Sequence, residues 1–231
     1  LYLGTNHQQA IETLRQLETF GFSGNHIIAE PCNRNTALAI GLMAKVLVDK
    51  DPDAVMSVFP ADHVITDSES FIKVLQKAET LAQKGFLVTL GIPPTRPETG
   101  FGYLQQGSKI EGYEGVCHVK QFVEKPDLNT AKLYLEEGNY FWNCGVFVWK
   151  ATTLLEELQQ YAGNIYSQLE NISGCLQNSK GNNTYLELSE KGQGLFSSLP
   201  SISIDYAVME KSSKVVLIPA DIGWNDVGAW N

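Results

Sequence analysis

AVMSVFPADH, at residues 54–63, begins with six residues that form a continuous apolar run. Such a run is typical of a strand that is buried on both faces of a parallel sheet. The run ends at a proline, and Asp62 and His63 follow it directly. Ligands of open α/β sheets bind just beyond the carboxyl ends of the strands. We therefore expect Asp62 to face a ligand crevice, although an aspartate beside a proline can also simply form a turn.

Strand-like and helix-like segments alternate around this stretch. Apolar residues recur at helical spacing over residues 37–48 and again over 71–82, where Asp67 or Ser68 caps the helix and Gly85 closes it. This alternation predicts an open α/β sheet with crossover helices. The expected strands are residues 1–5, 26–30, 54–59, 86–92, 117–126, 140–150 and 214–220. No linker separates domains, so we expect one domain over residues 1–231.

Composition excludes several classes of partner. The 231 residues include 26 acidic and 17 basic ones, a formal charge of -9, whereas proteins that bind nucleic acid usually present a basic surface. No apolar run reaches the ~18 residues of a membrane span. The cysteines are scattered at positions 32, 117, 144 and 175, which favours a reduced, cytoplasmic protein with structural thiols. The histidines show no zinc-binding spacing.

Further polar residues follow other expected strands. Asp226, in a DVG motif that ends at Gly228, is equally well a second metal carboxylate or a loop residue. Two carboxylates at two strand ends would suit magnesium bound to a nucleotide. Glu124 and Lys125 end another strand, where the lysine could bind a phosphate or only pair with the glutamate.

Three more segments carry candidate residues. Thr99 and Gly100 lie in the glycine-rich stretch PETGFGY. Asn143 interrupts an apolar strand, and a buried amide there needs either a structural network or a ligand hydroxyl. Arg34 and Asn35, between a strand and a helix, either face an anion or base or simply cap the helix.

The order of these motifs is more specific than any one of them. EPxxRNTA, PADH, ETGFGY, FVEKP, WNCG, SIDYAVMEK and WNDVG follow one another from residue 30 to residue 228. This order closely resembles the bacterial-type mannose-1-phosphate guanylyltransferase family, the GDP-mannose pyrophosphorylases, over essentially the whole chain. The resemblance implies a Rossmann-like mixed, mostly parallel sheet with flanking helices. It also implies a reaction in which GTP and mannose 1-phosphate give GDP-mannose and pyrophosphate, with Mg²⁺.

The resemblance also implies roles for individual residues. Asp62 and Asp226 match the metal-holding carboxylates, and together with Lys125 they would be the catalytic residues. The residues that match the surroundings of the sugar phosphate are Thr99, Gly100, Glu124, Lys125, Asn143 and Gly145. Those that match the surroundings of the nucleotide are Arg34, Asn35, Thr36, Asp62 and His63.

One hallmark of the family has no counterpart here. The family opens with a glycine-rich loop of pattern GGxGxRLxPxSRxxxPK, whereas this chain starts at LYLGTN, which matches the second strand. We therefore expect a fragment, truncated at both ends and inactive alone. A non-catalytic subunit that binds a nucleotide sugar, and a transferase with another base or sugar, are the alternatives. A homo-oligomer of the full-length protein also stays open.

Overall fold

The computed structural model describes residues 1–180 and 184–227, so Gly228 of the DVG motif lies outside the described residues. The chain divides into two compact units. Unit 1 comprises Leu1–Pro52 and Leu155–Val208, and unit 2 comprises Asp53–Leu154 and Met209–Asn231. The expectation of one domain over residues 1–231 stays a prediction.

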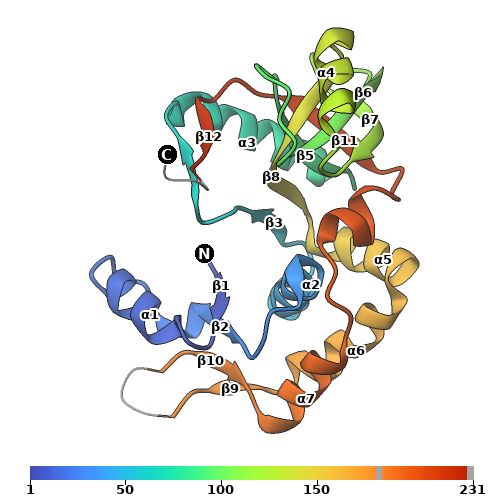
Figure 1. The fold of residues 1–231 in the computed structure, drawn as a ribbon. Coiled ribbons are helices and arrows are strands. Elements are labelled where there is room, and N and C mark those ends of the chain that lie inside the picture. The colour runs from blue at the N-terminus through green and yellow to red at the C-terminus, as the bar shows by residue number, and fades with distance from the viewer. Residues whose placement is uncertain (181–183, 228–231) are drawn as a thin grey trace. The chain divides into compact units, whose positions relative to one another are not determined.

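Unit 2 is built on a six-stranded sheet with the order β3-β8-β5-β11-β7-β6 (Figure 1). The strands are β3 (Val55–Val58), β5 (Leu87–Ile92), β6 (Gly102–Lys109), β7 (Cys117–Val123), β8 (Tyr140–Lys150) and β11 (Val215–Pro219). Strand β6 also pairs with β8, which closes β8, β5, β11, β7 and β6 into a ring. The α/β fold with a mixed sheet is thus confirmed, and every expected strand of this unit is present.

The direction of the strands differs from the expectation of a mostly parallel sheet. Among the described residues of this sheet, only β5 and β11 pair in parallel. Strands β3 and β5 do run the same way, but β8 lies between them in the opposite direction. Strand β3 is therefore an edge strand of this sheet, with Met56 buried and Ser57 exposed, and is not buried on both faces as expected. An apolar run by itself fixes neither the place of a strand in its sheet nor the direction of that strand.

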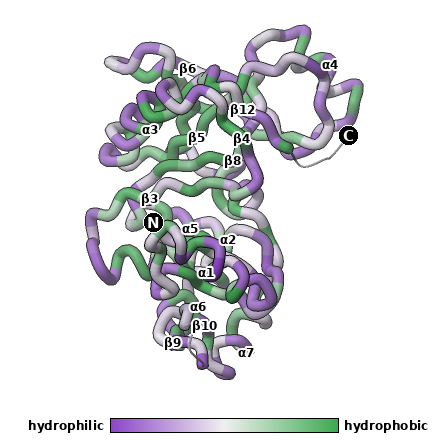
Figure 2. Tube along the Cα trace, turned by 90° about the vertical axis from the view of Figure 1, so that its left-hand side faces the viewer, coloured by the Kyte–Doolittle hydropathy of each residue, from purple (hydrophilic) through white to green (hydrophobic). Residues whose placement is uncertain are grey.

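Two helices of unit 2 have clear start and stop residues, and those of the helix over residues 68–82 are the expected ones. Helix α3 (Ser68–Ala82) is capped by Asp67, whose carboxylate accepts from the N–H of Ser70. Helix α4 (Leu128–Glu137) ends at Gly138, which has the left-handed φ of 70° that glycine tolerates best. The buried face of α3 packs on β8 and β5, the strands that are mostly hydrophobic in Figure 2.

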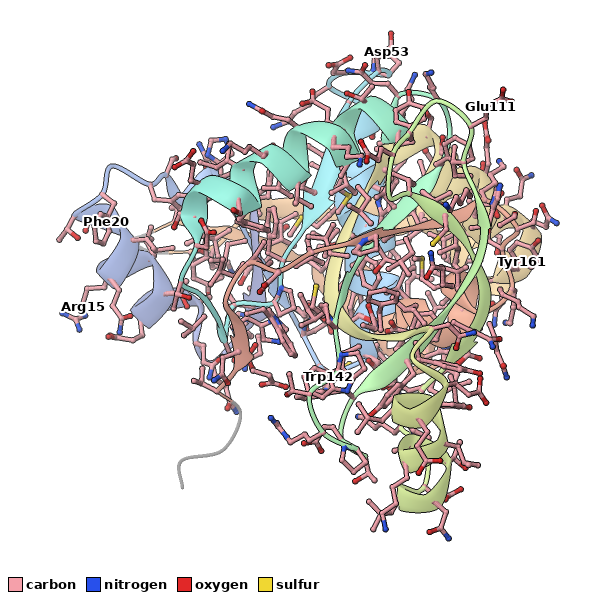
Figure 3. The ribbon with its side chains drawn as sticks, turned by 90° about the horizontal axis from the view of Figure 1, so that it is seen from above. Arg15, Phe20, Asp53, Glu111, Trp142 and Tyr161 are labelled. Atoms are coloured by element: carbon pink, nitrogen blue, oxygen red, sulfur yellow. The ribbon has the colours of Figure 1, made fainter. Side chains whose placement is uncertain are left out.

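The core of unit 2 is dense around β5 and β8. All six residues of β5 are buried, including the hydroxyl-bearing Thr89. Trp142 of β8 is 4% exposed and lies among packed side chains, whereas Asp53 and Glu111 project from the surface (Figure 3). Burial raises the pKa of the Cys144 thiol to about 12, which fits the expected structural role of this cysteine.

Unit 1 holds a four-stranded sheet of order β1-β2-β10-β9 with helices around it. Its strands are β1 (Leu3–Asn6), β2 (Ile27–Glu30), β9 (Leu176–Asn178) and β10 (Leu186–Leu188). Its helical segments are α1 (Ala10–Glu18), a 3₁₀ turn (Gly24–His26), α2 (Asn35–Val48), α6 (Gly163–Ser173) and α7 (Glu190–Ser198). Helix α5 (Ala151–Tyr161) and a π-helix (Asp205–Met209) cross the boundaries between the units. None of the helices among the described residues has the length and apolar character that a membrane crossing requires.

Candidate functional site

Two short strands outside the six-stranded sheet bring the predicted metal residues together. Strands β4 (His63–Ile65) and β12 (Trp224–Asp226) pair antiparallel, with Asp226 opposite His63, and Figure 2 shows them side by side. Asp62 directly precedes His63, so both aspartates lie at the same end of this ladder. The side chain of Asp62 is 74% exposed, and Asp226 is half-buried. The ladder thus places the backbones of both aspartates at one end, and their role as metal ligands stays a prediction.

The ladder is fixed by a close backbone approach at Gly223. The N–H of Thr66 donates to the carbonyl of Gly223, and the N–H of Asp67 donates to the carbonyl of Ile222. Gly223 has a φ of 61°, and a Cβ at this position would lie 1.9 Å from Oγ1 of Thr66. Glycine is therefore required here by both conformation and space.

His63 is held by the indole of Trp224. The Trp224 Nε1–H donates to Nδ1 of His63 over 3.1 Å, and the two rings meet edge to face at 5.3 Å. Nδ1 is thus the acceptor nitrogen, and Nε2 lies 3.9 Å from Oδ1 of Asp62. The histidine is packed and hydrogen-bonded beside the aspartates. Its predicted contact with the nucleotide stays a prediction.

The donor set at the ladder fits magnesium better than zinc. Magnesium is usually held by one or two carboxylates and completed by substrate phosphates and water. Asp62 and Asp226 supply two such carboxylates at one end of the ladder. Within residues 1–180 and 184–227, no group of three or more His, Cys, Asp or Glu side chains is placed to hold a metal. The metal itself stays a prediction.

A second cluster forms where β6, β7 and β8 meet. Gly102 of β6 pairs with Asn143 of β8, and Tyr103 pairs with Val123, the residue before Glu124. A Cβ at Gly102 would lie 2.6 Å from Oε2 of Glu124 and 3.4 Å from Cβ of Asn143. The absence of a side chain at Gly102 therefore lets the carboxylate and the amide approach each other. The Glu124 side chain is only 18% exposed.

The orientation of the Asn143 amide is set by two donors. The hydroxyl of Thr89 and the backbone N–H of Gly145 both donate to Oδ1 of Asn143, each over 3.2 Å. Gly145 has a φ of 70° and lies against Pro60 and His63, because a Cβ there would be 3.1 Å from the proline and 3.9 Å from the histidine ring. Gly145 thus connects the cluster around Asn143 with the PADH segment.

The PETGFGY loop is organised around Glu98. One carboxylate oxygen of Glu98 accepts from the N–H groups of both Thr99 and Gly100, each over 3.0 Å. The Gly100 N–H and the Arg96 guanidinium hold the pKa of this carboxyl below its usual value. The fully buried Tyr103 hydroxyl accepts from the N–H of Glu98 and donates to its carbonyl, both over 2.9 Å. The amides of Thr99 and Gly100 therefore converge on one negatively charged point.

Lys125 adds a cation beside the second cluster. Its Nζ lies 3.7 Å from Oε1 of Glu124, and its side chain is 63% exposed. Its φ is 49°, in the left-handed region that residues with a side chain seldom adopt. Among the described non-glycine residues, only Lys125 and Asn35 have a positive φ. Both are residues that the motif order had singled out.

The predicted nucleotide segment lies in unit 1, whereas the other predicted site residues lie in unit 2. Asn35 begins α2, and its N–H is bound by the side chain of Asn33. The Arg34 guanidinium donates to the carbonyl of Ser197, and Oγ1 of Thr36 accepts from the N–H of Ile204. The side chain of Arg34, at the N-cap position of α2, makes no capping hydrogen bond, whereas Oδ1 of Asn35 accepts from the N–H of Thr36 over 3.0 Å. The capping alternative thus receives no support at Arg34 and some support at Asn35.

Sequence reasoning missed five residues that shape the site. Gly102, Gly223, Thr89, Glu98 and Trp224 support residues that were predicted. The second glycine of the GFGY stretch and the lone threonine in the apolar run LVTLGI were available signals. No sequence signal indicated the contact of Trp224 with His63, because this contact depends on a ladder between two segments that are distant in the sequence.

Comparisons with known proteins show the family of the chain. The family model described as Nucleotidyl transferase matches residues 3–231. "Mannose-1-phosphate guanylyltransferase 2" of Escherichia coli O157:H7 is 40% identical over 98% of this chain and 47% of its own length. "Alginate biosynthesis protein AlgA" of Pseudomonas aeruginosa is 38% identical over 98% of this chain and 46% of its own length. The chain thus spans about half the length of the curated relatives it matches.

Solved structures show the same fold. A structure named mannose-6-phosphate isomerase, from Helicobacter pylori, matches with a TM-score of 0.84 at 32% identity and covers 97% of this chain and 84% of its own. A structure named mannose-1-phosphate geranyltransferase, from Thermus thermophilus, matches with a TM-score of 0.81 at 30% identity, over 99% of this chain and 61% of its own.

Proposed function

Because the chain belongs to the nucleotidyl transferase family, we propose that it forms the core of an enzyme that makes GDP-mannose and pyrophosphate from GTP and mannose 1-phosphate. The names of the curated relatives support this substrate pair, since several are called mannose-1-phosphate guanylyltransferase. The observation that carries the proposal is the β4–β12 ladder, which brings Asp62 and Asp226 to one end of two strands.

In the proposed reaction, a phosphate oxygen of mannose 1-phosphate attacks the α-phosphorus of GTP in line. A new oxygen–phosphorus bond forms, the bond between the α-phosphorus and the bridging oxygen to the β-phosphate breaks, and pyrophosphate leaves with the electron pair. Such transfers depend on positioning and charge neutralisation, so no covalent bond to the protein is required. Magnesium, which Asp62 and Asp226 would hold, neutralises charge on the phosphates when bound.

The second cluster is suited to a sugar phosphate. The Glu124 carboxylate can accept from one sugar hydroxyl, and the Asn143 amide can donate to another. Lys125 would bind the phosphate as a point charge. The N–H groups of Thr99 and Gly100, which donate to the Glu98 carboxylate, would donate to an anion or hydroxyl of the substrate if that carboxylate moved away. A buried site built to hydrogen-bond hydroxyls rejects analogues that lack them. Arg34, Asn35 and Thr36 would contact the guanine nucleotide.

Substrate binding is the first test, because it depends only on residues that the chain contains. Calorimetric titration with mannose 1-phosphate and with GDP-mannose, in the presence of Mg²⁺, should give saturable binding to the chain. Asp226→Asn should weaken the binding of GDP-mannose with Mg²⁺ and leave unchanged the weaker binding without it. Asp221→Asn, a change at an exposed aspartate on the same segment, is the matched control and should behave as wild type.

Turnover is the second test. Pyrophosphate release from GTP and mannose 1-phosphate is measured with the chain alone and with the chain fused to the first strand–loop–helix unit of a curated relative. We expect pyrophosphate release from the fusion, and no conversion of mannose 6-phosphate by either protein. Binding of GDP-mannose without release by the fusion would favour the non-catalytic subunit, and competition by other nucleoside triphosphates would reveal another base specificity.

A further inference from the structure

We propose that Thr89 is a positioning residue that sets which end of the Asn143 amide meets the sugar, and thereby which hydroxyl chemistry the site accepts. This inference rests on the proposed function, because it concerns recognition of the sugar phosphate. Thr89 lies in the middle of β5, is 0% exposed, and donates its hydroxyl to Oδ1 of Asn143 over 3.2 Å.

The orientation of the amide follows from the chemistry of its neighbours. The backbone N–H of Gly145 can only donate, so the Asn143 atom 3.2 Å from it has to be the carbonyl oxygen. The Thr89 hydroxyl, whose other acceptor is the more distant carbonyl of Val146 at 3.5 Å, donates to that same oxygen over 3.2 Å. Both donors therefore hold the oxygen inward, and the NH₂ group lies on the opposite branch of the amide. The side of Asn143 that a sugar meets is then a hydrogen-bond donor.

A threonine is unusual in the middle of a buried, otherwise apolar strand, which indicates a specific role for its hydroxyl. The other residues of β5 are Leu, Val, Leu, Gly and Ile, and all six positions are buried. A buried hydroxyl costs free energy unless it is hydrogen-bonded, so valine would serve the core equally well. The hydroxyl is bonded to the one polar side chain that interrupts β8. Together with the N–H of Gly145, a buried donor of this kind holds the amide in one of two orientations that packing accepts equally well.

The strand pairing places Thr89 and Asn143 at the second cluster, which is proposed to bind the sugar phosphate. Asn143 pairs with Gly91 of β5 on one side of β8 and with Gly102 of β6 on the other. Glu124 approaches from the side of Gly102, so a carboxylate acceptor and an amide donor lie next to each other. The carboxylate binds a hydroxyl that donates a hydrogen bond, and the amide NH₂ binds a hydroxyl that accepts one. The pair therefore distinguishes neighbouring hydroxyls by their hydrogen-bonding role. A flipped Asn143 would present two acceptors and lose that discrimination.

The test compares Thr89→Val with Thr89→Ser. Valine has the same shape as threonine but no donor, and serine restores the donor. Thr153→Val, at another buried threonine of unit 2, is the matched control for loss of a buried hydroxyl. Mannose 1-phosphate and its deoxy and deoxyfluoro analogues at each hydroxyl position are titrated calorimetrically into each variant. Fluorine can accept a hydrogen bond weakly but cannot donate one.

We expect Thr89→Val to weaken the binding of mannose 1-phosphate by about 3- to 10-fold, the effect of one hydrogen bond. At one hydroxyl position, wild type should bind the deoxyfluoro analogue more tightly than the deoxy analogue, and Thr89→Val should lose this preference. Thr89→Ser should recover both properties, and Thr153→Val should keep them. Wild-type affinity and selectivity in Thr89→Val would overturn the inference.

A readout without any ligand separates this inference from the proposed function. The side-chain NH₂ signals of Asn143, assigned by their loss in Asn143→Asp, are recorded by NMR in the unliganded chain. Thr89→Val should shift or broaden them, and Thr89→Ser and Thr153→Val should not. Unchanged signals in Thr89→Val would refute the positioning role. Changed signals in a chain that binds no mannose 1-phosphate would refute the proposed function and leave the positioning of Asn143 intact.

Discussion

Lys125 offers a test in which stability and binding should move in opposite directions. Its φ of 49° lies in the left-handed region, where a residue with a Cβ loses about 1–2 kcal/mol relative to a relaxed backbone. Glycine removes this strain but adds about 0.5–1 kcal/mol of backbone entropy to the unfolded state. The ion pair with Glu124 contributes little, because the lysine side chain is 63% exposed.

The matched control is Lys125→Met, which removes the charge but keeps a Cβ at the strained position. We expect Lys125→Gly to be more stable than Lys125→Met by about 0.5–1 kcal/mol, equivalent to about 1–4 °C in melting temperature for a chain of this size. Urea and thermal denaturation, followed by the fluorescence of the tryptophans, measure this difference.

Binding should respond to the charge alone. Both variants lose the cation that is proposed to bind the phosphate, so calorimetry should show about 10-fold weaker binding of mannose 1-phosphate in each, the size of effect expected for a hydrogen bond to a charged group. A glycine variant less stable than the methionine variant would show that any strain at residue 125 is smaller than the entropy cost of glycine. Wild-type affinity in Lys125→Met would show that the lysine is not a phosphate ligand.

Three further predictions concern close approaches and burial. Gly102→Ala should weaken the binding of mannose 1-phosphate about 10-fold, measured by calorimetry, because its Cβ would lie 2.6 Å from the Glu124 carboxylate. Gly223→Ala should lower the melting temperature more than Gly112→Ala, since both have a positive φ but only Gly223 meets another atom, at 1.9 Å. Burial raises the pKa of Glu30 to about 7, above its usual 4.5, so the folded state binds this proton more tightly and stability falls as the pH rises from about 4.5 to about 7. Glu30→Gln should therefore raise the melting temperature by a few degrees at pH 8 and leave it nearly unchanged at pH 4.5.

Local patterns were sufficient to predict α2, α3 and the seven expected strands. The helical repeat over residues 71–82 and the caps at Asp67 and Gly85 predict α3 to within a few residues. These signals act over three or four residues and need no tertiary context. Strand order and direction do need it. Nothing in YFWNCGVFVWK indicates that β8 runs between β3 and β5 in the opposite direction.

The glycine-rich stretch shows the same limit at the site. PETGFGY was singled out only as a glycine-rich stretch with Thr99 and Gly100, but Gly102 begins β6 and pairs with Asn143. The role of Gly102 depends on the pairing between β6 and β8, which a local motif does not show. Likewise, β4 and β12 are each three residues long, which is too short for an alternating pattern to be visible.

Two residues of the predicted motifs, Asn35 and Lys125, have a left-handed backbone conformation. Asn35 and Lys125 belong to the motifs EPxxRNTA and FVEKP, and both adopt a φ that favours glycine. Asparagine tolerates this conformation at little cost, so Asn35 is compatible with a purely structural turn at the start of α2. Lysine does not, and the 3.7 Å ion pair with Glu124 is too exposed to offset the strain. A strained residue that adds nothing to stability is retained for what its side chain does, which makes the ammonium group of Lys125, rather than Asn35, the stronger indicator of a binding site.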